Sequence, residues 1–422
     1  MDTSVMVTLG FLVFAIVMFA WEKIPLSITA MVVAVGLHLS GVLSAKEAFA
    51  GFVDPNVLLF MGMFVIGEAF FATGVAVGVG NVVHKFAKTE TSLLVAVMMI
   101  TGILSGFLSN TGTAAVLIPV IIGICKKSGF KQTKLLMPLV FAAAMGGNIS
   151  LIGAPGNMIA QAGLQQAGLG SFGFFDYGLV GLPILIVGTI FYATIGKCFL
   201  PDAPSHQPDG AFEGNDDYSH VPSWKKWTAA IVLILTIVAM IFEKQLGVKL
   251  YVSAWVGALV LVATNVISET AAVKSIDMKT IMLFAGSMAL GDAMVKTDTG
   301  GVIADIIVNS LGASPSPIVV LVVLFVLGVF MTNFMSNTAT CALLVPIGLS
   351  LASQLGFEPK AVLAAIVIAS SLAYATPIGM PANTMVYNIV GYSFMDYVKA
   401  GLPLIVVSSI VALVLLPILF PF

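Results

Sequence analysis

The stretches Ser109-Asn110-Thr111 and Ser336-Asn337-Thr338 decide how this sequence folds. Each stands in the middle of an apolar segment, and a proline follows eight residues later, at Pro119 and Pro346. The two copies are offset by 227 residues. Three adjacent polar side chains suit a lipid-facing helix poorly, because hydrocarbon offers no hydrogen-bond partners. The same anomaly in two halves predicts a binding site at the interface of a repeat.

The composition is that of a membrane protein. Hydrophobic residues make up 59% of the 422 positions and charged residues 9%, with a mean hydropathy of +1.08. A soluble domain carries about 25% charged residues, so this chain could not cover a core with polar surface. We expect no cleaved signal peptide, since Asp2 is the only charge before Trp21 and no small-residue cleavage site follows.

All eighteen basic residues are lysines. An anion site here therefore cannot use the bidentate guanidinium fork of arginine, and must rely on hydroxyls, amides, helix N-termini or bound cations. The three cysteines and four histidines are dispersed, with neither metal-ligand spacing nor a nucleophile beside a base. An enzyme is therefore disfavoured, and nothing in the composition points to nucleic acid.

Matching residues divide the chain into two repeats. Phe60, Gly62, Gly67, Glu68 and Thr73 recur at an offset of 224 as Phe284, Gly286, Gly291, Asp292 and Thr297. We expect a first repeat over 1–200, a polar cytoplasmic linker over 201–226 and a second repeat over 227–422. The predicted spans are 4–21, 25–43, 56–80, 135–163 and 178–199, then 228–242, 250–267, 280–309, 361–390 and 399–420.

The segments that carry the two polar phrases, about 93–124 and 318–352, are too long for single spans. As one helix each would extend about 48 Å, whereas the hydrocarbon core is about 30 Å thick. Two short helices joined at the polar phrase fit better, as a re-entrant hairpin that enters and leaves on one side. The alternative is one kinked spanning helix.

Lysine placement agrees with the hairpin interpretation. Five crossings in each half give the halves opposite orientations. Tracing the loops then puts thirteen lysines, Lys85 and Lys88 among them, on one side and four on the other. Such a bias is typical of a cytoplasmic face, so both termini are expected outside the cytoplasm.

We expect the partner of each hairpin tip to be a broken helix. The breaks are Gly153-Ala154-Pro155-Gly156-Asn157 and Thr376-Pro377-Ile378-Gly379-Met380-Pro381-Ala382-Asn383. Proline and glycine interrupt a helix and free backbone carbonyls, which with Ser and Asn oxygens suit a monovalent cation such as sodium. Half-helix N-termini suit an anion. Ser105 and Thr332 lie four residues before Ser109 and Ser336, a spacing that predicts a shared helical face.

Glu68 and Asp292 are the acids within long apolar segments, where a charge is expensive. They could bind protons or cations. We favour a structural role at a helix end near the headgroups, with Lys296 as a partner for Asp292.

These features resemble the divalent anion:sodium symporter family, the dicarboxylate, citrate and sulfate carriers within the ion transporter superfamily. The resemblance covers nearly the whole chain and implies an all-α polytopic membrane protein. It would have two inverted-topology repeats of five transmembrane helices, each with a re-entrant hairpin and a broken helix. It also implies a homodimer in the cell membrane, of the prokaryotic inner-membrane type, working by an elevator mechanism without a resident cofactor.

The resemblance also assigns residues. It implies one sodium site at Ser105, Ser109, Asn110 and the carbonyl of Gly153, and a second at Thr332, Ser336, Asn337 and the carbonyl of Gly379. The positions that line a small anionic substrate would be Asn110, Thr111, Asn337, Thr338, Ala154 and Met380. Family members often carry a hydroxyl residue where this chain has Ala154 and Met380, which leaves the identity of the substrate open.

The function that these observations predict is secondary transport of di- or tricarboxylates (succinate, malate, fumarate or citrate), by sodium symport or by exchange. The alternatives are a sulfate carrier, or a cation/proton antiporter or arsenite carrier of the same superfamily that would depend on Glu68 and Asp292.

Overall fold

The computed structural model describes residues 2–21, 23–75, 78, 89–205, 218–302 and 315–422, and these residues form helices and no β-strand. Lys85, Lys88, the middle of the expected linker and the far ends of the predicted spans 56–80 and 280–309 lie outside the described residues.

The helices of the first half are α1 (Thr3–Trp21), α2 (Leu26–Leu39), α3 (Ala45–Ala48), η1 (Ala50–Val53), α4 (Pro55–Ala72), α6 (Glu90–Ser105), α7 (Asn110–Ser128), η2 (Gln132–Lys134), α8 (Leu136–Gly146), α9 (Pro155–Gln166), α10 (Gly178–Ala193) and η3 (Gly196–Phe199). Those that follow are η4 (Tyr218–His220), α11 (Ser223–Ile241), α12 (Glu243–Leu246), α13 (Leu250–Ala263), α14 (Glu269–Ser275), α15 (Met278–Lys296), α17 (Pro317–Thr332), α18 (Asn337–Leu355), α19 (Lys360–Ser370), α20 (Pro381–Val390) and α21 (Phe394–Leu419).

The surface of these helices is that of a membrane protein. Six of the described helices, α4, α7, α11, α15, α18 and α21, are long and apolar enough to cross a bilayer. Large apolar side chains such as Ile234 and Leu235 on α11 and Leu259 on α13 are more than half exposed. So many exposed apolar side chains would be unfavourable in water, whereas they are favourable in contact with lipid. The prediction of an all-α polytopic membrane protein is confirmed.

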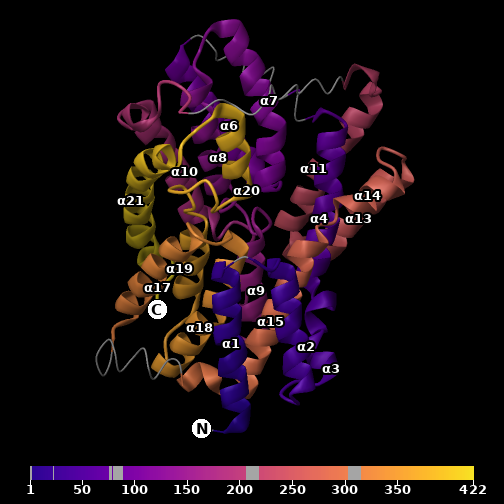
Figure 1. The fold of residues 1–422 in the computed structure, drawn as a ribbon. Coiled ribbons are helices and arrows are strands. Elements are labelled where there is room, and N and C mark those ends of the chain that lie inside the picture. The colour runs from indigo at the N-terminus through magenta and orange to yellow at the C-terminus, as the bar shows by residue number, and fades with distance from the viewer. Residues whose placement is uncertain (1, 22, 76–77, 79–88, 206–217, 303–314) are drawn as a thin grey trace.

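Each segment with a polar phrase is broken into two helices at that phrase. α6 ends at Ser105 and α7 begins at Asn110, while α17 ends at Thr332 and α18 begins at Asn337. The pair α6–α7 occupies one end of the molecule and α17–α18 the other (Figure 1). This opposed placement is what re-entrant hairpins of inverted repeats predict, although their sidedness in a membrane stays a prediction.

The predicted spans 135–163 and 361–390 are also broken, as the glycine and proline residues indicated. α8 is followed by α9 and α19 by α20, and both second helices begin with a proline at their first position. That position tolerates proline because its missing N–H would have no partner inside the helix.

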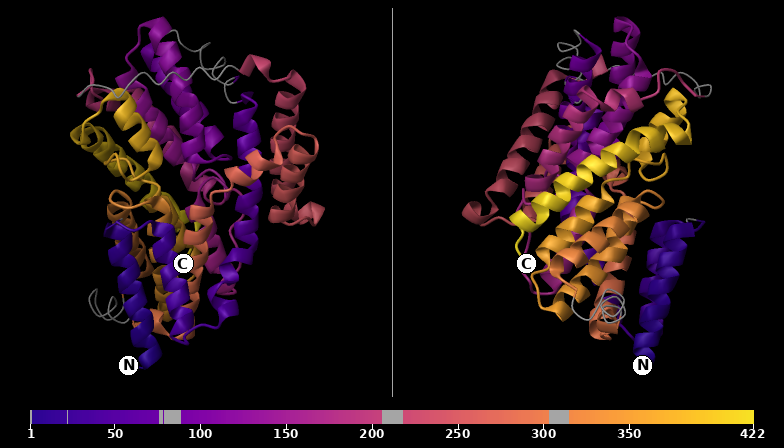
Figure 2. Two further views of the ribbon diagram at one scale, coloured as in Figure 1. Left: turned by 45° about the vertical axis from the view of Figure 1, so that its right-hand side comes forward. Right: turned by 90° about the vertical axis from the view of Figure 1, so that its left-hand side faces the viewer.

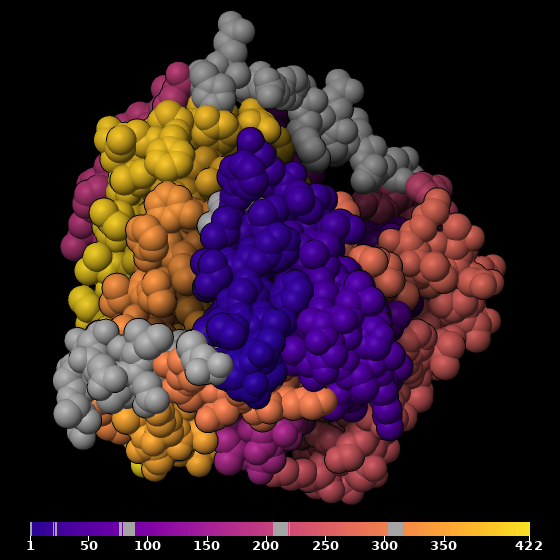
Figure 3. Space-filling model, turned by 60° about the horizontal axis from the view of Figure 1, so that its bottom comes forward, coloured from indigo at the N-terminus to yellow at the C-terminus, as the bar shows by residue number. Residues whose placement is uncertain are grey.

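Equivalent helices of the two halves pack in equivalent pairs. α2 packs against α15 and α4 against α13, while α6 packs against α8 and α17 against α19. α10 packs against α21, which runs obliquely across the other helices in yellow (Figure 2). Seen from the end that holds the N-terminus, the indigo helices lie between orange segments of the second half and the salmon helices near residue 260 (Figure 3). Two groups of helices result, with the tips and breaks inside one of them.

Candidate functional site

The first tip brings a serine, an asparagine and two backbone carbonyls together. The hydroxyl of Ser105 is fully buried and lies 2.7 Å from both Oδ1 of Asn110 and the carbonyl oxygen of Ala143. With its amide turned over, Asn110 places Nδ2 3.2 Å from the Ala143 carbonyl and 3.3 Å from the carbonyl of Gly153. The side chain of Asn110 therefore joins the hairpin tip to the ends of both α8 and α9.

The second tip repeats this arrangement atom for atom. The amide of Asn337 lies 2.9 Å from the hydroxyl of Thr332, 3.0 Å from the carbonyl of Ser370 and 3.2 Å from the carbonyl of Gly379. Thr332 also donates to the carbonyl of Ser370. Its hydroxyl is five residues from Asn337 and 38 from Ser370, the same separations that Ser105 has in the first half.

Each cluster can therefore exist in two forms. With Nδ2 inward, the asparagine donates to three oxygens and the cluster is closed by hydrogen bonds. With Oδ1 inward, four oxygens converge around a single hydroxyl hydrogen. Buried oxygens without donors are unfavourable unless a cation lies among them. The oxygens of each cluster could therefore hold a cation only with the amide turned so that Oδ1 points inward.

Ser109 and Ser336 have a different position from the one their spacing suggested. Because α6 ends at Ser105 and α17 at Thr332, neither serine shares a helical face with the earlier hydroxyl residue. Instead Ser109 Oγ accepts from the backbone N–H of Gly112 at 2.9 Å. Ser336 Oγ accepts from the N–H of Ala339 at 3.2 Å. Both serines are N-caps, and they fix where α7 and α18 begin.

Several helix N-termini lie at the level of the breaks. Thr111 and Thr338 are half-buried in the first turns of α7 and α18. Ala154 and Met380 precede the first residues of α9 and α20 and provide no side-chain cap. α9 packs against α18 and α20 against α7, so the helix that follows each break also contacts the hairpin of the other half. Positive helix ends with uncapped N–H groups attract anions.

The tips and breaks contain no charged side chain. The stretches 105–111, 143–157, 332–338 and 370–383 consist entirely of neutral residues. An ion bound there would therefore interact with helix dipoles, hydroxyls and carbonyls of these stretches, and with no charged side chain among them.

Sequence reasoning missed two ligand-quality groups, the carbonyls of Ala143 and Ser370. A backbone oxygen leaves no mark in the side-chain pattern, and alanine and serine do not resemble each other. The offset of 227 does relate these two positions, and it was the one signal that could have found them.

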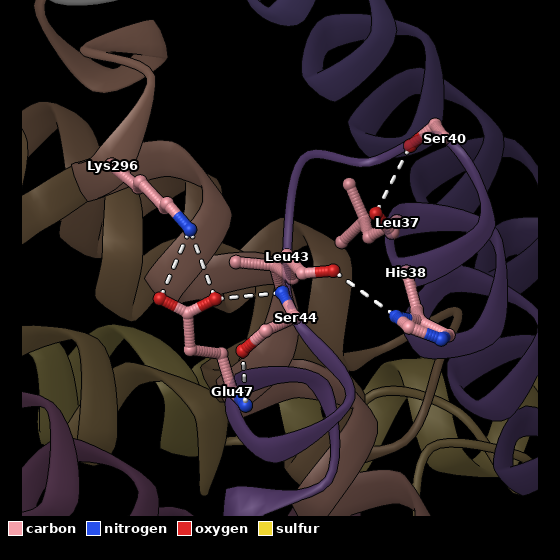
Figure 4. A network of polar contacts seen from close by, with 7 residues as sticks. All are labelled: Leu37, His38, Ser40, Leu43, Ser44, Glu47 and Lys296. Carbon is pink, nitrogen blue, oxygen red and sulfur yellow. Dashed lines mark hydrogen bonds and ion pairs between the residues drawn. The ribbon is translucent and has the colours of Figure 1, made fainter.

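A cavity of about 1210 Å³ opens beside the second hairpin, between α9, α15, α18 and the segment 43–50. Asp292 lines this cavity. The expected pairing of Asp292 with Lys296 is wrong, because Lys296 Nζ lies 2.9 and 3.0 Å from the two carboxylate oxygens of Glu47 (Figure 4). The capping box of α3, in which Ser44 and Glu47 bond each other, holds Glu47 toward the end of α15.

The hydrogen bond from Lys296, together with weaker contributions from the backbone N–H and the side chain of Ser44, lowers the pKa of Glu47 from 4.5 to about 2. The pair is exposed to water at the mouth of the cavity, so it is sensitive to salt.

Comparison with known proteins bears on what this site does. The model of a family described as citrate transporter matches residues 16–347 and 237–422. The uncharacterized transporter YfbS of Escherichia coli is 24% identical, with full coverage of both chains. The sodium-dependent dicarboxylate transporter SdcS of Staphylococcus saprophyticus is 24% identical over 95% of this chain and 83% of its own.

Among solved structures, the YdaH transporter of Alcanivorax borkumensis is similar, with a TM-score of 0.66 and 15% identity over 97% of both chains. At that identity the likeness shows the fold. These relatives and structural neighbours are transporters, so the prediction of a carrier rather than an enzyme is confirmed.

Proposed function

This chain belongs to the citrate transporter family, and from that premise we propose that it is a secondary carrier of di- and tricarboxylates such as succinate, malate, fumarate and citrate. Transport would be coupled to sodium or would proceed by exchange. The observation that carries the proposal is the duplicated oxygen cluster at the two tips, set among helix N-termini without any charged side chain.

The geometry of the clusters favours a hard cation. Oxygens that bind one such ion at about 2.3–2.6 Å stand roughly 3 Å apart. The inward atom of each asparagine amide lies 2.7–3.3 Å from the hydroxyl and the two carbonyl oxygens of its tip. The relatives named as sodium-dependent dicarboxylate transporters support sodium as that cation.

A carboxylate substrate suits the N-termini of α7 and α18. Without arginine, the chain can neutralise a dianion there only through helix dipoles, the side chains of Asn110, Thr111, Asn337 and Thr338, and cations bound at the tips. Two cation sites beside one anion site would balance the charge of a dicarboxylate.

An elevator movement is supported by the different heights at which the two hairpins contact α4 and α15. A Cβ atom at Gly67 of α4 would lie 3.9 Å from Leu108, at the first tip. At the equivalent Gly291 of α15, the neighbour is Pro346 at 3.6 Å. Pro346 stands eleven residues beyond the residue equivalent to Leu108. Nine of these steps run along α18 from Asn337 to Pro346, so at 1.5 Å per residue the hairpins contact their partner helices at levels that differ by about 14 Å.

If the two repeats exchange these contacts between states, the tips travel by that distance relative to α4 and α15. Inverted repeats move in this manner when one bundle slides against the other. The first tip reaches the end of α4 that is predicted to be cytoplasmic, so the transporting bundle is displaced toward the cytoplasm.

Two tryptophan–lysine pairs are of the kind found at a membrane–water boundary. Lys23 Nζ lies 4.6 Å from the ring centre of Trp21, and Lys225 Nζ lies 5.6 Å from that of Trp224. Tryptophan and lysine gather at the membrane–water boundary. The lysine distribution assigns both pairs to the cytoplasmic side, and we propose on that basis that both termini lie outside. The homodimer implied by the resemblance stays a prediction.

The test is uptake of labelled succinate, malate and citrate by proteoliposomes, with a sodium gradient, with potassium in its place and with unlabelled substrate inside. A symporter responds to the gradient, and an exchanger requires the internal substrate. Sulfate and arsenite are included as competing substrates. Uptake of none of the carboxylates under any of these conditions would overturn the proposal.

A further inference from the structure

The loops that carry the Gly153 and Gly379 carbonyls are each held by one asparagine. Asn157 Nδ2 donates to the carbonyls of Gly147 and Ser150, both at 2.8 Å. Asn383 Nδ2 donates to the carbonyls of Ala373 and Thr376, at 2.7 and 3.1 Å. The sequence separations, ten and seven residues, are identical in the two halves.

Both asparagines act only as donors. Asn157 is 1% exposed and Asn383 fully buried, and the Oδ1 atom of each has no hydrogen-bond partner among the described residues. An apolar residue of the same shape would avoid this unpartnered oxygen. An unsatisfied buried acceptor is unfavourable, so the two donated hydrogen bonds must offset the free-energy cost of this oxygen.

A hydroxyl ties each loop to its hairpin tip. Ser150 Oγ donates to the carbonyl of Gly106, and Thr376 Oγ1 donates to the carbonyl of Asn333. The asparagine therefore binds the carbonyl of the residue whose side chain reaches the tip. By fixing the position of this residue, the asparagine also fixes the distance between the tip and the break.

A tyrosine supports each asparagine from behind. The hydroxyl of Tyr177 donates to the backbone carbonyl of Asn157 at 3.2 Å, and that of Tyr397 to the carbonyl of Asn383 at 2.7 Å. Both tyrosines are fully buried. Each break is thus held by the same three groups, an asparagine, a hydroxyl residue and a tyrosine.

We propose that Asn157 and Asn383 are positioning residues that set the Gly153 and Gly379 carbonyls at cation-binding distance from Asn110 and Asn337. The inference rests on the proposed sodium sites and extends them to residues that touch neither ion nor substrate. Sodium affinity at each tip then depends on an asparagine outside the oxygen cluster, and so does the discrimination between sodium and the smaller lithium.

The experiment measures sodium-dependent thermal stabilisation of the purified protein in detergent, with choline keeping the ionic strength constant. Lithium is titrated in parallel. Asn157→Asp and Asn383→Asp keep the side-chain size but remove the amide donors and set an oxygen against two carbonyls. Loss of two buried hydrogen bonds predicts a rise of about tenfold or more in the half-saturating sodium concentration, with a changed sodium-to-lithium ratio.

Gln161→Glu is the matched control. Gln161 is 3% exposed and lies on α9 one turn beyond Asn157, and its Oε1 accepts from the backbone N–H of Phe172 at 2.7 Å. The same amide-to-acid change there leaves the break untouched, so sodium half-saturation stays within twofold of wild type. If the control shifts it as strongly as Asn157→Asp does, the effect is one of buried charge and the inference is overturned.

Tyr177→Phe covers the case in which the asparagine variants do not fold. It removes one hydroxyl and is expected to move half-saturation two- to threefold in the same direction. If the variants fold and keep the wild-type half-saturating sodium concentration and sodium-to-lithium ratio, this inference is overturned while the proposed sodium coupling stands. A wild-type protein that sodium does not stabilise at all overturns the proposed sodium coupling, and this inference with it.

Discussion

Replacing Gly153 with alanine tests the cation site by moving one carbonyl. A Cβ atom there would lie 2.5 Å from the carbonyl oxygen of Gly147 and 3.0 Å from that of Gly106. Both are backbone atoms, so no side chain can rotate away. Ordinary contact begins at 3.4 Å, and the break must therefore shift by about 0.9 Å.

The carbonyl of Gly153 belongs to the peptide unit that moves. Crowding of this kind costs about 1–3 kcal/mol of stability. A misplacement near 1 Å can lower the efficiency of a site on the order of 100-fold. We expect Gly153→Ala to fold, to unfold at a lower temperature and to require far more sodium for half-maximal succinate uptake.

Gly123→Ala is the control, because Gly123 lies inside α7 and a Cβ atom there would have nothing within 4 Å. That change should stabilise the helix by about 0.5–1 kcal/mol and leave sodium dependence unchanged. The assays are proteoliposome uptake against sodium concentration and thermal unfolding in detergent. A Gly153→Ala protein with wild-type sodium dependence would refute the assignment of this carbonyl to the site.

Three further predictions follow from the same structure. Asn110→Ala or Asn337→Ala should abolish uptake while the protein elutes as wild type in size-exclusion chromatography, and wild-type rates from either would contradict the tip assignment. Because its lysine partner depresses the pKa of Glu47, the pair stabilises the fold above pH 4.5 and loses that effect as pH falls toward about 2. The melting temperature of Glu47→Gln, measured in low salt, should therefore fall less between pH 7 and pH 3 than that of the wild type. An equal fall in the two proteins would refute the stabilising role of the pair. Cysteines at Gly291 and Met335 should be cross-linked by a short reagent during turnover, since the opposite state brings them level. The absence of a cross-link under every transport condition would argue against a travel of about 14 Å.

The sequence could predict the parts of the site that have side chains. The two tips and the hydroxyl residues before them recur at an offset of 227, and the breaks recur at 226. All of them could be found because each combines polar or helix-breaking residues with an apolar background. Their convergence follows from topology, since each hairpin packs against the broken helix of its own half, α6 and α7 on α8 and α17 and α18 on α19.

What could not be predicted depends on where helices end. The shared face of Ser105 and Ser109 assumed that α6 continues, but the helix stops at Ser105 and Ser109 caps the next one. The partner of Lys296 is 249 residues away on α3, and no local pattern points there. The carbonyls of Ala143 and Ser370 are defined only by backbone geometry.

The absence of formal charge at the tips has an energetic consequence for coupling. A dianion that entered the empty cradle alone would carry uncompensated charge into a low-dielectric interior, at a free energy that dipoles cannot fully repay. Under the proposed sodium coupling, bound cations would bring the loaded tips close to electroneutrality, and the neutral assembly would cross most easily. Leakage of either species without the other would then be suppressed by electrostatics, without a separate gate.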